Sequence, residues 1–114
     1  MIVVHNEMQI RHRDDLTSII SVWLPVGVHI VIAEAWITPI AQWVMTFGIY
    51  DENDDTIGSN MSAFVIPGYG SQRFSHTYIV HVEGTSKHII LGVTHNTGEE
   101  IETIIGVMRT VQIR

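Results

Sequence analysis

Residues 22–36 read Val-Trp-Leu-Pro-Val-Gly-Val-His-Ile-Val-Ile-Ala-Glu-Ala-Trp, and this stretch decides the fold. Pro25 fixes its φ angle and cannot donate a ladder hydrogen bond, while Gly27 supplies the conformational freedom that a turn requires. We therefore expect one strand to end near Pro25 and a long second strand to begin near Val28. The residues that follow are mostly β-branched or aromatic, which disfavours a helix and favours a strand.

The rest of the chain repeats this pattern of short strands and turns. Apolar and polar residues alternate with a period of two, and turn residues interrupt them about every ten positions. Because no helical pattern persists, we predict an all-β protein of about eight to nine strands, which is a two-sheet antiparallel sandwich, a jelly roll or a barrel. The expected strands are residues 2–12, 18–24, 27–38, 42–50, 61–66, 73–83, 87–95, 101–105 and 107–113.

Four turn signals separate these strands most clearly. Asp14-Asp15 is expected to close the first strand, and the acidic run 51–55 reads as a polar hairpin tip. Residues 96–98, Asn-Thr-Gly, read as another turn. Gly106 is expected to bend or bulge the last strand, since glycine in a strand interior often marks such a site.

Composition limits the possible functions of the chain. Its 114 residues suit a single domain spanning 1–114, which we expect to be a complete protein. Hydrophobic residues make up 46% and charged residues only 16%, and such an apolar surplus is typical of a subunit interface. A net charge of −6 argues against nucleic-acid binding, and the absence of cysteine excludes disulfides and thiolate sites. No signal peptide and no apolar run of about 20 residues is present, so we expect synthesis in a cytoplasm and no membrane partner.

The order of these features resembles the jelly-roll modules of the tumour-necrosis-factor and complement-globular-head superfamily, and in particular the small versions in bacteriophage structural proteins. The matching segments are 24–30, with Pro-x-Gly before an apolar strand; 43–50, followed by the acidic turn; 78–93, with its Glu-Gly-Thr turn; and the closing strand 107–113. This resemblance implies an antiparallel two-sheet jelly-roll sandwich. It also implies a homotrimer with a structural or adhesive role, in which 107–113 is similar to the strand at the trimer axis.

Histidine is the main candidate for metal or proton chemistry, because imidazole does both. Ligands on one face of a strand are separated by an even number of residues, and no two of the seven histidines are two residues apart. A cupin, a small jelly-roll metalloenzyme, needs a His-x-His pair that is missing here. Its second motif is also shifted, because His29 follows Gly27 after one residue and Ala33 stands where Asn is required. We expect no catalytic residue, metal or cofactor.

Two acidic features have an alternative to a simple structural role. Asp51-x-Asn53-x-Asp55 is the opening of a calcium loop, but Thr56 replaces the glycine that such a loop needs. We therefore favour a solvated hairpin over a calcium site. Glu34 places a charge inside an apolar strand, and pairing with an arginine at an edge or interface is the favoured interpretation.

The expected contacts are with copies of the chain and with a virion protein. Residues 1–13 are interpreted either as the first strand of the sandwich or as an arm that adds to a neighbour's sheet. Tyr69, between two glycines in the 67–70 loop, is a candidate for docking on a subunit or a sugar. The interface candidates are Ile2, Val4, Met8, Tyr69, Arg109, Val111 and Ile113.

The resulting functional expectation is a virion structural protein, assembled in the host cytoplasm and not an enzyme. The first hypothesis is a trimeric capsid decoration, or cement, protein that binds the major capsid protein of a tailed phage and stabilises its head. No shaft, heptad or collagen-like repeat precedes the domain, which favours this over the alternative, the receptor-binding head of a tail fibre that recognises host saccharide. The third hypothesis is a small metal-dependent enzyme of the cupin type.

Overall fold

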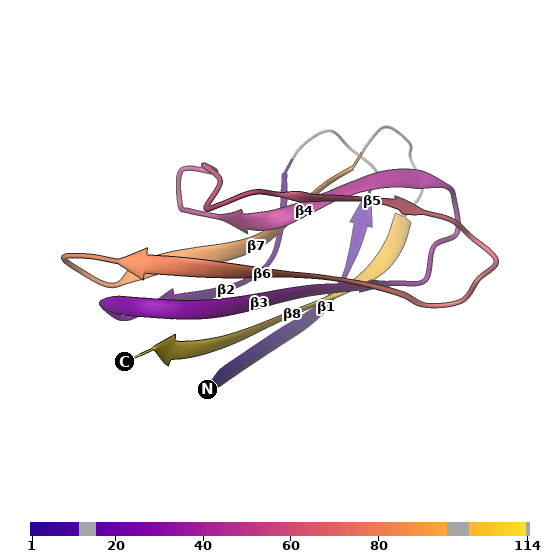
Figure 1. Cartoon of the computed structure of the whole chain (residues 1–114). Coiled ribbons are helices and arrows are strands. Elements are labelled where there is room, and N and C mark those ends of the chain that lie inside the picture. Colours follow the sequence, from indigo (N-terminus) through magenta and orange to yellow (C-terminus); the bar gives the residue numbers. More distant parts are fainter. Residues whose placement is uncertain (12–15, 96–100, 114) are drawn as a thin grey trace.

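Eight strands and no helix make up the described part of the chain in this computed structural model, which covers residues 1–11, 16–95 and 101–113 (Figure 1). The strands form two antiparallel four-stranded sheets, as predicted, in the orders β1-β8-β3-β6 and β2-β7-β4-β5. The described residues thus include no helix that could cross a membrane. The strand bounds are β1 Ile2–Arg11, β2 Thr17–Leu24, β3 Gly27–Ile37, β4 Trp43–Tyr50, β5 Met61–Val65, β6 Gln72–Val82, β7 Lys87–His95 and β8 Ile101–Ile113.

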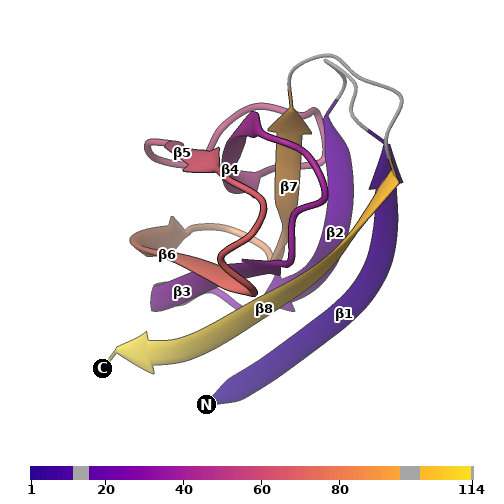
Figure 2. The same ribbon diagram turned by 90° about the vertical axis from the view of Figure 1, so that its right-hand side faces the viewer.

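The two halves of the chain pair with each other as one long, folded hairpin. Strand β1 pairs with β8, β2 with β7, β3 with β6 and β4 with β5, all antiparallel. The hairpin then rolls up, so that β3 also pairs with β8 and β4 also pairs with β7. This pairing is the jelly-roll topology. The two layers and their curvature are visible along the strands in Figure 2, and both termini lie at the same end of the sandwich in Figure 1.

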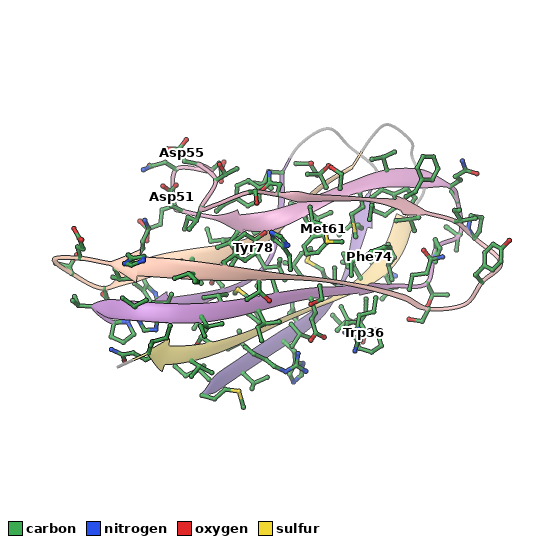
Figure 3. All side chains as sticks on the ribbon, in the orientation of Figure 1. Trp36, Asp51, Asp55, Met61, Phe74 and Tyr78 are labelled. Atoms are coloured by element: carbon green, nitrogen blue, oxygen red, sulfur yellow. The ribbon has the colours of Figure 1, made fainter. Side chains whose placement is uncertain are left out.

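The core lies between the two sheets and is formed by every second residue of each strand. Met61, Phe74 and Tyr78 project into this space from β5 and β6 (Figure 3). Burial of such side chains stabilises the fold by about 25 cal/mol per Å² of apolar surface. The largest fully buried side chains are Phe47, Ile10, Leu24, Ile37, Met45, Ile49, Ile89, Leu91, Ile104, Met108, Val31 and Val65.

The last strand differs from the prediction. Residues 101–105 and 107–113 belong to a single strand, β8, whose register with β1 and β3 continues unbroken through Gly106. The predicted bend or bulge there is therefore wrong. Glycine is needed because the opposite sheet comes close: a Cβ at this position would lie 2.5 Å from Ile19 Cγ2 and 3.1 Å from Leu91 Cδ2. The register shift occurs instead in β2, between Ser18 and Ile20.

The N-terminal segment forms part of the sandwich. Residues Ile2–Arg11 pair with β8 along their whole length, and Ile10 is buried in the core. This confirms the interpretation of the segment as the first strand rather than a free arm. The turns predicted at Asp14–Asp15 and 96–98, together with His12 and Arg13, lie outside the described residues, as does the side chain of His95.

Adding one methyl group at Gly106 tests the close approach of the two sheets. Gly106→Ala should lower the free energy of unfolding by about 1–3 kcal/mol, because overpacking forces neighbouring side chains to shift. Urea denaturation monitored by circular dichroism measures the change. Thr103→Ala, an exposed position on the same strand, should change stability by less than about 0.5 kcal/mol. Equal stability of Gly106→Ala and the wild type would contradict the packing described here.

Candidate functional site

Strand β3 is apolar on both of its faces. His29, Val31 and the following alternate residues point into the core, where all are buried. The intervening positions, which point away from the core, are Val28, Ile30, Ile32, Glu34 and Trp36. A strand of an antiparallel sheet with one solvated face normally alternates apolar and polar residues. The outward side of β3 departs from this pattern and is suited to being covered.

The neighbouring strands extend this apolar surface on both sides. Ile30 lies directly opposite Ile79 of β6 and Val111 of β8, so the three side chains share one face. Ile79 is 64% and Val111 41% exposed. Trp36 projects from the same sheet away from the other layer (Figure 3). We call this surface the outer face; its apolar members are Val3, Val28, Ile30, Ile32, Trp36, Ile79, Ile105, Val107, Val111 and Ile113.

A neutralised charge lies in the middle of the outer face. Arg109 Nη1 donates to Glu34 Oε1, and Trp36 Nε1 donates to Glu34 Oε2 at 3.1 Å. The Arg73 guanidinium carbon lies 5.3 Å from the centroid of the Trp36 ring, within range of a cation–π interaction. The Glu34 side chain is only 11% exposed. The expected pairing of Glu34 with an arginine is thus confirmed, and the pair adds no net charge to the apolar surface.

Polar residues occupy the edges of the outer face. His5 and Glu7 lie on edge strand β1, while Ser75, Thr77 and His81 lie on edge strand β6. The apolar residues are concentrated on the two central strands, β8 and β3. An apolar centre with a polar rim is the usual anatomy of a protein–protein interface.

The predicted interface residues fall into three groups, on β8, in the 67–70 loop and on β1. Arg109, Val111 and Ile113 lie on the outer face, in the register that pairs β8 with β3. Tyr69 is 78% exposed in the loop between β5 and β6, outside this face.

The three β1 candidates lie on the core side of their strand. Val4 and Met8 lie opposite Met108 and Ile104 and pack against the core. Ile2, in the same alternation, remains half-exposed at the end of the sandwich. Val4 and Met8 are therefore core residues in this chain. Successive side chains of a strand point to opposite faces. Because residues 3, 5 and 7 of β1 point outward, Val4 and Met8 point toward the core.

Sequence reasoning missed most of the outer face. Ile30, Ile32, Trp36, Ile79 and Ile105 were not predicted as interface residues, although all point outward. The available signal was that β3 does not alternate: apolar residues occupy both its odd and its even positions. Which neighbours flank β3 depends on long-range pairing, which the sequence pattern does not specify.

The histidines have structural contacts of their own. His29 is 2% exposed, and its Nε2 lies 2.7 Å from the carbonyl oxygen of Pro25. A carbonyl oxygen only accepts, so Nε2 carries the proton in this contact and does not present a lone pair to a metal. His76 packs edge-on against the ring of Tyr78, with centroids 4.8 Å apart. Within the described residues, no three His, Asp or Glu side chains gather into a metal-binding group.

The acidic hairpin tip uses its first carboxylate to hold its own backbone. Asp51 Oδ1 accepts hydrogen bonds from the backbone amides of Asn53, at 2.8 Å, and Asp55, at 3.1 Å. The amide of Asp51 in turn donates to the carbonyl of Asp55 at 2.9 Å. This arrangement supports the solvated-hairpin interpretation of the calcium-like motif.

A pair of buried tyrosines lies between the sheets near β4. Burial raises the pKa of Tyr50, and the hydrogen bond that its hydroxyl accepts from Asn60 Nδ2 at 3.0 Å partly offsets this. Burial, together with the nearby Tyr50, raises the pKa of Tyr78 to about 12. The Tyr78 hydroxyl lies close to the Ile49 backbone but has no hydrogen-bond partner of good geometry among the described residues.

Comparison with known protein families and with curated proteins gives no match for this chain. The features that bear on function are therefore the outer face, its ion pair and the exposed side chains elsewhere on the sandwich.

Removing one partner of this partly buried ion pair should be costly. Arg109→Leu leaves the Glu34 carboxylate without its cation, and we expect the free energy of unfolding to fall by about 1–2 kcal/mol, less than for a fully buried pair because the Arg109 side chain is 38% exposed. The double variant Glu34→Gln/Arg109→Leu keeps an acceptor for Trp36 and should recover most of the loss. Urea denaturation at a fixed protein concentration measures both. Equal destabilisation in the single and double variants would contradict this role of the pair.

Replacing Tyr78 by phenylalanine tests the unpaired hydroxyl. Tyr78→Phe should raise the free energy of unfolding at neutral pH by about 1 kcal/mol, because it removes a buried polar group without a partner. In the wild type, unfolded tyrosine ionises near pH 10 and folded Tyr78 only near pH 12. Stability should therefore fall as pH rises through this interval, and fall less in Tyr78→Phe.

Urea denaturation between pH 7 and 12 measures both effects of the Tyr78 substitution. The matched control is Tyr69→Phe, at an exposed position, which should show the wild-type profile. A loss of more than about 1 kcal/mol in Tyr78→Phe at neutral pH would show instead that the hydroxyl is hydrogen-bonded.

Proposed function

We propose that this chain is a structural protein that assembles into a homotrimer through its outer face, and that the trimer is a capsid decoration protein of a tailed phage. The observation that carries the proposal is the outer face itself, an apolar sheet surface whose central acidic group, Glu34, is already paired. Soluble monomers rarely expose apolar patches of this extent. The jelly-roll topology and the apolar β8 strand agree with the role that the sequence resemblance implies.

The size of the outer face is appropriate for a stable contact. Four strands about 4.8 Å apart and about eleven residues long, at about 3.3 Å per residue, cover roughly 700 Å². A standard interface buries about 800 Å² on each partner. Nearly the whole face would therefore be covered in the assembly.

A second exposed apolar patch favours a ring over a two-fold dimer. Phe64, Ile66 and Tyr69, on β5 and in the loop that follows it, are all exposed and lie outside the outer face. Contact between two different surfaces is heterologous, and it forms a closed ring when the rotation closes. A ring of three subunits would cover both patches on every copy.

A rigid trimer of this kind would function by adhesion. Loops at the ends of the sandwich would contact the major capsid protein while the sandwich keeps its shape. Binding at a local threefold axis bridges neighbouring shell subunits and adds buried area that resists internal pressure.

A charged substitution in the outer face should prevent assembly without unfolding the subunit. Val111→Glu places a carboxylate at an exposed position of the apolar centre, where covering it would be costly. We expect sedimentation velocity at micromolar concentration to give a trimer for the wild type and a monomer for Val111→Glu. Val26→Glu, an exposed valine in the β2–β3 turn outside this face, should remain trimeric. A wild-type monomer, or a Val111→Glu trimer, would contradict the proposed interface.

Electron microscopy of the intact virion tests the decoration role separately. Density for the trimer at the threefold positions of the head would support it. Density at the tip of a tail fibre would overturn it in favour of a receptor-binding head.

A further inference from the structure

The sheet opposite the outer face presents a tryptophan whose ring is supported from one side. Trp23 of β2 lies opposite His88 of β7, and both side chains point outward. The two rings stack with centroids 4.6 Å apart and planes inclined by 16°. Trp23 remains 56% exposed. The His88 ring thus covers one face of the Trp23 ring, while more than half of the Trp23 surface stays accessible for contact.

His88, which stacks on Trp23, lies next to an acidic side chain. His88 Nδ1 lies 3.4 Å from Glu52 Oε1, which belongs to the acidic hairpin tip. The tip is itself fixed by the hydrogen bonds from backbone amides to Asp51 Oδ1. The two rings and the hairpin tip therefore lie next to one another, so that an aromatic ring is bordered by polar groups.

A cleft of about 280 Å³ lies beside these residues, and most of the side chains that line it are polar. Besides Trp23 and His88, it is lined by Asp51, Glu52, Asn53 and Lys87. Carboxylates accept, the lysine donates and the asparagine amide does both. The volume lies near the lower end of the range for small-molecule sites, about 300–1,000 Å³.

We propose that this cleft binds a neutral saccharide. A sugar ring offers an apolar face of C–H groups, which suits a flat aromatic platform, and hydroxyl groups around its rim, which suit mixed donors and acceptors. With two carboxylates and one lysine, the cleft disfavours an anionic ligand. A wholly apolar ligand would leave the polar lining unpaired. This site lies on the sheet β2-β7-β4-β5 and does not depend on assembly through the outer face.

Nuclear magnetic resonance offers a direct test, because the chain has three tryptophans and thus three indole N–H signals. Uniformly ¹⁵N-labelled protein is titrated separately with glucose, galactose, mannose and N-acetylglucosamine to tens of millimolar. The Trp23 signal, assigned from Trp23→Phe, should shift saturably with at least one of these sugars. The signals of Trp36 and Trp43 should not shift. Glucuronate, the anionic control, should bind more weakly than the neutral sugar.

Variants distinguish a specific binding site from nonspecific binding. Trp23→Ala should weaken binding of the active sugar at least about tenfold, equivalent to about 1.4 kcal/mol. The matched control, Ile40→Ala, removes another large exposed apolar side chain, one outside the cleft and outside both proposed subunit contacts, and should bind as the wild type does. Absence of a Trp23 shift with all four sugars would overturn the proposal. Equal binding by Trp23→Ala, or an equal shift with glycerol, would overturn it as well.

Discussion

The constraint on which the structure depends is the position of β3, hydrogen-bonded to β6 on one side and β8 on the other. Its inward residues form the centre of the core, and its outward residues form the centre of the outer face. A slip of one residue would exchange the two sets and bring Glu34 and Trp36 into the core. The register of this strand therefore determines both the packing of the sandwich and which residues form the outer face.

Placing a charge pair in the centre of an apolar surface has a physical consequence for assembly. Glu34 receives hydrogen bonds from Arg109 and Trp36 within the same chain, so its charge is compensated before any partner arrives. Covering the face then requires no new ion pair across the interface. The opposite sheet has a different character, with a stacked Trp23 and a polar cleft. One sheet is thus suited to permanent burial and the other to reversible contact with a small polar ligand.

Much of the fold could be predicted from the sequence because strands carry a local signal. The turn after Pro25 and the alternation of residues in strands such as β6 predicted where strands occur and roughly where they end. The all-β pattern by itself left a sandwich, a jelly roll and a barrel open, and the resemblance favoured the jelly roll. The face that each residue occupies was harder to predict. Val4 and Met8 are predicted at an interface but lie on the core side of β1, partly buried against the core. Gly106 is required by Ile19 of the other sheet rather than by a bend. The pairing of Trp23 with His88, 65 positions apart in the chain, depends on β2–β7 register and left no motif to recognise.

The central claim is that copies of this chain cover the outer face in solution. Multi-angle light scattering of the unmodified protein, measured over a range of micromolar concentrations, tests this most directly. We predict a constant mass of three times the chain mass of 12.9 kDa. A constant mass of one chain across the same range would contradict the claim.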